Sequence, residues 1–89
     1  MGTSEVDGTI QVDDKVRRII AVHLDVDAGR LSPATRLGED LCVDSLTAVE
    51  ILMVLEDEFD IALPEDEVGE LRTYADLVNV VADRVAARA

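Results

Sequence analysis

The sequence is poor in aromatic residues and in cysteine. Phe59 and Tyr74 are its only aromatics, and Trp is absent. Because clefts that hold small-molecule substrates usually rely on aromatic surface, this scarcity argues against a substrate-gripping cleft. Cys42 is the only cysteine, so an internal disulfide is excluded, which suits a reducing compartment. No apolar run is long enough for a membrane span, and the first nine residues have no signal-peptide pattern. These absences predict a soluble cytoplasmic protein.

Basic residues are also missing from the middle of the chain. Residues 37–71 contain twelve Asp and Glu and no Lys or Arg, within a chain of formal net charge −12. Such a field repels nucleic acid and anionic membranes and attracts basic protein surfaces. We therefore expect no nucleic-acid or membrane partner. The alternative is an acidic surface that only keeps the protein soluble.

Apolar residues recur at helical spacing in three stretches, residues 12–24, 45–59 and 74–85. Asp44 can cap the second helix, Pro64 can open a short third one, and Thr73 with Asp76 can cap the last. Residues 25–43 show no sustained period. The sequence predicts an all-α, monomeric four-helix bundle, three helices long and one short, with a long loop between the first two. Residues 1–8 are expected to be a flexible leader and residues 9–89 a discrete single domain.

The predicted second helix has two apolar faces. A core-facing stripe comprises Ala48, Ile51, Leu52, Leu55 and Phe59. Leu46, Val49 and Met53 lie opposite, with acidic residues around them at Glu50, Asp57 and Asp60. An apolar row rimmed by carboxylates is typical of a docking surface for basic partners. The alternative is that the loop over residues 25–43 covers this row.

Ser45 stands at the first turn of that helix, next to both faces. An Asp-Ser pair before an apolar run is by itself typical of a simple helix cap. The longer runs DLCVDSLTAVEI (residues 40–51), LEDEF (55–59) and IALPEDE (61–67) resemble the acyl carrier protein family. By this resemblance, Ser45 receives 4′-phosphopantetheine from coenzyme A, and Asp44 helps to engage the phosphopantetheinyl transferase. The resemblance also implies that acyl-loading and condensing enzymes dock on this protein through basic surfaces. The residues that would contact them are Leu46, Val49, Glu50, Met53, Glu56 and Asp57.

Cys42 departs from the family pattern, which has glycine three residues before the serine. Glycine there suggests a backbone conformation that cysteine tolerates less well. We interpret Cys42 as a small packed residue, with disulfide or redox regulation as alternatives. No catalytic residue is predicted, because the only histidine, His23, has no evident partner. No metal site is predicted either, since the run from Asp25 to Gly29 lacks the later ligands of a calcium loop.

The sequence therefore predicts an acyl carrier and not an enzyme. It would hold acyl groups as thioesters on the Ser45 arm and shuttle them in fatty-acid, polyketide or specialised-metabolite biosynthesis. A branched aliphatic core could also part to shelter an acyl chain. Two alternatives remain open: an aminoacyl or peptidyl carrier of a nonribosomal peptide pathway, and an acidic adaptor with no prosthetic group.

Overall fold

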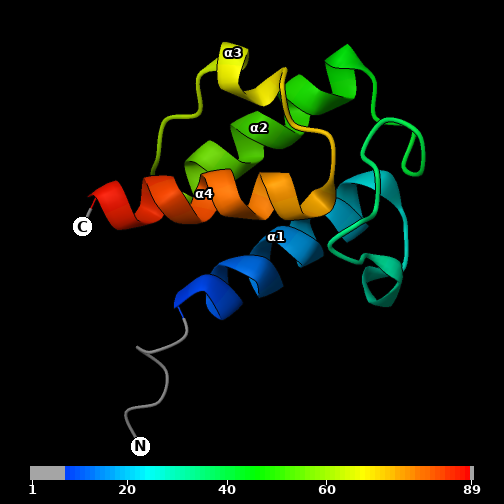
Figure 1. Ribbon diagram of the computed structural model, residues 1–89, viewed down its shortest axis with the longest axis horizontal. Coiled ribbons are helices and arrows are strands. Elements are labelled where there is room, and N and C mark those ends of the chain that lie inside the picture. The colour runs from blue at the N-terminus through cyan, green and yellow to red at the C-terminus, as the bar shows by residue number, and fades with distance from the viewer. Residues whose placement is uncertain (1–7, 89) are drawn as a thin grey trace, which may run out of the picture.

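The computed structural model describes residues 8–88, in which the regular elements are helices joined by irregular connections (Figure 1). The elements are α1 (Gly8–Leu24), the 3-10 helix η2 (Ala28–Arg30), α2 (Ser45–Phe59), α3 (Glu65–Val68) and α4 (Tyr74–Arg88). Within this range there is no β-strand, only an isolated antiparallel bridge between Arg36 and Thr73. The prediction of an all-α fold is confirmed.

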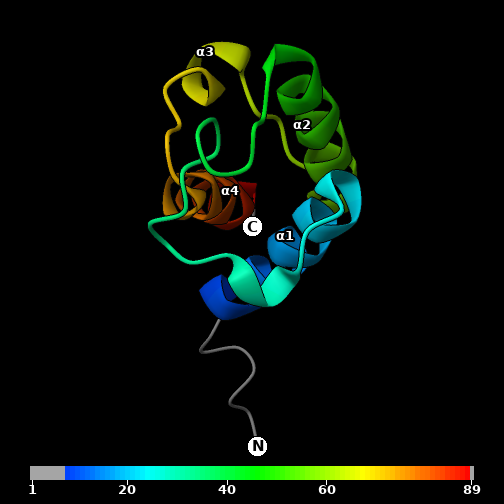
Figure 2. The same ribbon diagram turned by 90° about the vertical axis from the view of Figure 1, so that its right-hand side faces the viewer.

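Three long helices build the core. α1 packs against α2 and α4, which Figures 1 and 2 show from two directions. Val16, Leu55 and Val81, one from each helix, are fully buried at the centre. Burying an aliphatic side chain of this kind is worth roughly 1.5–3 kcal/mol, so the helical stripes hold the domain together. α3 is a single turn, joined to α4 by an ion pair between Glu67 and Arg84, and the predicted four-helix bundle is not confirmed.

Side-chain caps set where the helices begin. The Asp44 carboxylate accepts a hydrogen bond from the Thr47 backbone N–H (2.8 Å), so α2 starts at Ser45 as predicted. Thr73 and Asp76 cap α4 reciprocally. The Thr73 hydroxyl accepts from the Asp76 N–H (3.2 Å), and the Asp76 carboxylate accepts from the Thr73 N–H (3.1 Å). The local residues at both helix starts thus determine the boundaries.

The connection between α1 and α2 contains η2 and is anchored at two places. Arg17 of α1 donates hydrogen bonds to the carbonyls of Ala28 (3.0 Å) and Leu31, and the Leu31 side chain is buried. Further along, the Leu37 N–H donates to the Arg72 carbonyl (2.9 Å), beside the start of α4 (Figure 2). These anchors fix the path of the chain just before Ser45.

The leader predicted over residues 1–8 lies, apart from Gly8, outside the described residues, and Gly8 is the first residue of α1. Of the helices that the structure describes, none has the length and apolar content needed to cross a membrane.

Candidate functional site

Ser45 is an exposed residue at the first position of α2. The hydrogen bond from the Thr47 backbone to the Asp44 carboxylate holds the pKa of Asp44 below its usual range. Asp44 is therefore a charged, exposed side chain directly beside the Ser45 hydroxyl. The positive end of the α2 dipole also lies here, so an anion attached to Ser45 would be stabilised.

A cavity of about 250 Å³ adjoins Ser45. Ser45, Asp44 and two glycines, Gly38 and Gly69, lie on its wall, and the remaining lining is aliphatic: Ile20, Leu24, Leu37, Val43, Ala48, Ile51, Leu52, Leu71 and Leu77. These residues come from α1, α2, α4, the connection between α1 and α2, and the connection between α3 and α4, so the cavity opens between helices. An apolar chain attached at Ser45 would find matching surface there.

The outer face of α2 is exposed. The relative exposures of Leu46, Val49 and Met53 are 69%, 39% and 62%. The alternative, that the 25–43 loop covers them, is wrong, because that loop is anchored to Arg17 and to the residues before α4. The predicted exposure of the apolar row is confirmed, while its role in docking stays a prediction.

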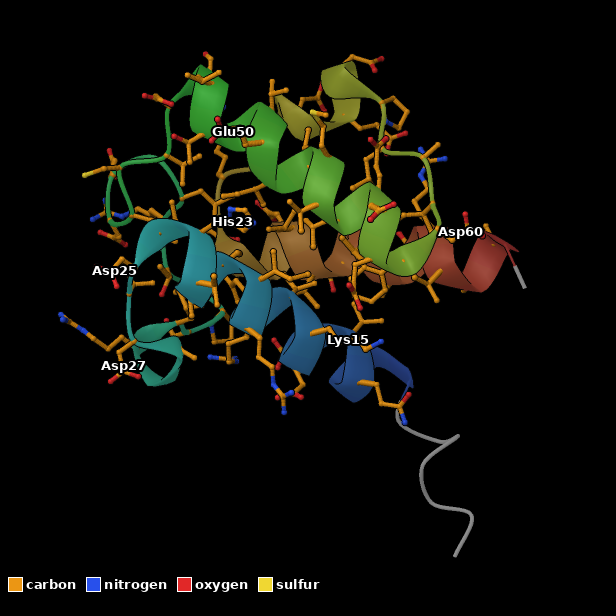
Figure 3. All side chains as sticks on the ribbon, turned by 180° about the vertical axis from the view of Figure 1, so that it is seen from behind. Lys15, His23, Asp25, Asp27, Glu50 and Asp60 are labelled. Atoms are coloured by element: carbon orange, nitrogen blue, oxygen red, sulfur yellow. The ribbon has the colours of Figure 1, made fainter. Side chains whose placement is uncertain are left out.

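Acidic side chains surround this row. Glu50, Asp57 and Asp60 are exposed, and none of them forms an ion pair with another described residue. Figure 3 shows Glu50 toward the start of α2 and Asp60 at its end. Glu56 differs: it is half-buried, and its Oε2 accepts a hydrogen bond from the Leu63 N–H (2.8 Å). Glu56 therefore stabilises the turn after α2 in addition to any contact with a partner.

Cys42 is exposed, so the interpretation of a packed residue is wrong. Its φ angle is 57°, in the left-handed region that glycine favours, as the glycine of the family pattern suggested. Sequence reasoning also missed Val22, which is 79% exposed on α1. No set of three or more His, Cys, Asp or Glu side chains in the described part of the chain could hold a metal ion.

Comparisons with known proteins give the family. Residues 14–81 match the family described as phosphopantetheine attachment site. An acyl carrier protein from Picosynechococcus sp. is 40% identical over 77 residues, which cover 86% of this chain and 95% of that protein. One from Thermosynechococcus vestitus is 38% identical over the same shares of each chain. The solved acyl carrier protein of Enterococcus faecalis superposes with a TM-score of 0.74 at 26% identity, covering 85% of this chain and 96% of that one. That of Thermotoga maritima, at 20% identity and a TM-score of 0.79, supports the fold alone; it covers 93% of this chain and 96% of that one.

Proposed function

The chain belongs to the acyl carrier proteins, and from that premise we propose that Ser45 bears the 4′-phosphopantetheine arm. Members of this family are carriers and not enzymes, and phosphopantetheine is their prosthetic group. One observation supports Ser45 above all: its hydroxyl is exposed at the start of α2 and lies on the wall of an apolar cavity. No other serine of the described residues has both properties.

The residues around Ser45 suit an attached phosphodiester. The start of α2 offers the positive end of the helix dipole to the negative charge. When attached, the arm supplies a thiol that holds an acyl group as a thioester. The chain's own contribution is to keep the attachment point exposed to enzymes and to offer the cavity as shelter for an apolar cargo. The long connection and two residues that follow α3, Gly69 and Leu71, complete the wall of this cavity.

Partner enzymes would dock on the outer face of α2. Leu46 and Met53 offer exposed apolar contact area, and the exposed carboxylates of Glu50, Asp57 and Asp60 attract Arg and Lys on the partner. Asp44, exposed beside Ser45, would meet the phosphopantetheinyl transferase. Exposed charges of this kind give contacts that weaken with added salt, as a carrier that must release each partner requires.

The cargo proposed is an acyl group of fatty-acid, polyketide or specialised-metabolite biosynthesis, carried in the cytoplasm by a monomer. The acyl carrier proteins among the relatives and the aliphatic cavity both favour this over an aminoacyl or peptidyl cargo. Mass spectrometry of the arm on protein purified from its native host distinguishes them. An amino acid on the arm would contradict the acyl assignment.

Incubation with coenzyme A and a promiscuous phosphopantetheinyl transferase, followed by intact mass, tests the attachment site. The native chain should gain one phosphopantetheine, and the Ser45→Ala variant none. Ser32→Ala is the matched control, because Ser32 is also exposed but lies away from the cavity, and this variant should be modified fully. An unmodified native chain, or modification of Ser45→Ala, would contradict the proposal.

A further inference from the structure

Two arginines that lie far apart in the sequence meet beside the Ser45 cavity. Arg36 and Arg72 flank the stretch of residues 37–71 that contains no Lys or Arg. The bridge between Arg36 and Thr73 brings them together, through hydrogen bonds from the Leu37 N–H to the Arg72 carbonyl (2.9 Å) and from the Tyr74 N–H to the Thr35 carbonyl (2.8 Å). Figures 1 and 2 both show the connection passing beside the start of α4. The bridge thus places two arginines side by side where a strongly acidic stretch begins and ends.

These arginines line a second cavity of about 280 Å³. Its other lining residues are Gly38, Glu39 and Leu71, and Gly38 and Leu71 also line the cavity at Ser45. The two cavities therefore adjoin across the same two residues. A Cβ placed on Gly38 would have no atom within 4 Å beyond its chain neighbours, so Gly38 borders open space at this boundary.

The two arginines differ in how their charge is matched. Arg36 is already paired, with Nη2 3.1 Å from Asp40 Oδ1 and a second ion pair to Glu39. The Arg72 side chain is exposed and forms no ion pair with any described residue. Asp76 is the acid in contact with Arg72, through the Arg72 backbone N–H (3.0 Å), so a ligand anion entering the second cavity would still meet an exposed guanidinium that has no ion-pair partner among the described residues.

We infer that this second cavity binds an anionic group carried by the Ser45 arm, with Arg72 as its counter-ion. The inference rests on the proposed attachment at Ser45. Two sources of that anion exist: a carboxylate at the far end of the acyl cargo, and the phosphodiester of the arm. The layout favours the carboxylate, because Ser45 lines the first cavity and not the second. The apolar stem of a dicarboxylic half-thioester would lie in the first cavity and its free carboxylate at Arg72.

Three arm forms distinguish the sources: the unloaded arm, a hexanoyl arm and an adipoyl arm, each installed from the matching coenzyme A compound. Intact mass confirms loading before any other measurement, so a failure to load counts against the proposed function and is seen separately. The backbone amide signals of Gly38 and Leu71 are then compared in 15N–1H spectra of the native chain, Arg72→Gln and Arg18→Gln. Arg18→Gln is the control of equal charge change, because Arg18 is exposed on α1 and lines neither cavity.

If the second cavity binds the carboxylate, the two amide signals should differ between the hexanoyl and adipoyl forms in the native chain and in Arg18→Gln. In Arg72→Gln this difference in chemical shift should be absent. A 13C-labelled adipoyl carboxyl should also titrate roughly half a pH unit lower in the native chain than in Arg72→Gln, because a nearby cation favours the carboxylate. The phosphodiester would be assigned as the anion by a different result. In that case the Gly38 and Leu71 amide signals would move equally from the chain without the arm to all three arm forms, and Arg72→Gln would abolish this movement. Spectra that do not depend on Arg72 in any form would overturn the inference.

Discussion

The Cys42→Gly variant is expected to be more stable than the native chain, because Cys42 adopts a backbone conformation that a side chain disfavours. Its φ angle is 57°. An L-residue with a Cβ loses about 1–2 kcal/mol in the left-handed region. Glycine avoids that cost but gives up about 0.5–1 kcal/mol through its greater freedom in the unfolded chain. Because the thiol is exposed, no buried contact is lost with it.

The net expectation is a stabilisation of about 0.5–1 kcal/mol, which in a domain of this size raises Tm by several degrees. Urea and thermal unfolding under reducing conditions, followed by circular dichroism, measure it. Cys42→Ala keeps the Cβ and removes the thiol, so its stability should stay close to that of the native chain. Asp60→Gly should gain less than Cys42→Gly, because aspartate tolerates the left-handed region better than most residues. A Cys42→Gly variant no more stable than Cys42→Ala would refute the backbone argument.

Three further outcomes are expected. Tyr74→Phe should lower the free energy of unfolding by about 1–2 kcal/mol, because the buried hydroxyl donates to the backbone carbonyl (3.0 Å) and the carboxylate of Asp13; chemical denaturation measures this, and an unchanged midpoint would contradict it. Backbone hydrogen bonds from Arg72 and Thr73 lower the pKa of Asp76 in the folded state, so the unfolded chain binds its proton first. That stabilisation is present above the ordinary aspartate pKa near 3.8 and is lost as the pH falls through the lower folded value, so Asp76→Asn should show a weaker fall in Tm in this acid range. Met53→Glu should slow transferase-catalysed modification several-fold with little change in Tm, whereas the same change at Val22, which is exposed on α1, should leave the rate unchanged; equal rates would argue against docking on α2.

Local chemistry explains why the helices could be predicted. The cap at Asp44 and the reciprocal cap at Thr73 and Asp76 involve residues three apart, so they form wherever the chain folds into a helix. The exposed row of Leu46 and Met53 follows from helical periodicity in the same way. Each of these features depends on spacings that can be read directly along the chain.

The features that the sequence did not predict depend on the tertiary environment of a residue and not on the spacing of residues along the chain. Cys42 was expected to pack, yet it is exposed, because the burial of a loop residue depends on segments that lie elsewhere in the sequence. The partner contacts of Glu56 stay a prediction, but the sequence did not reveal that its carboxylate also accepts a hydrogen bond from the Leu63 N–H, seven residues on. Local periodicity carries no information about a turn that closes over a helix end.

The sequence by itself determined the helical segments, the cap beside Ser45 and the apolar, acid-rimmed outer face, because hydrogen bonding and periodicity within a helix are short-range. Only the tertiary structure decided that a cavity opens at Ser45, since its walls come from α1, α2, α4 and two connections. It also decided that Arg36 and Arg72 stand together, because a bridge between distant segments sets that distance. The proposed attachment site could therefore be predicted from the sequence, whereas the cavity beside it is a property of the fold.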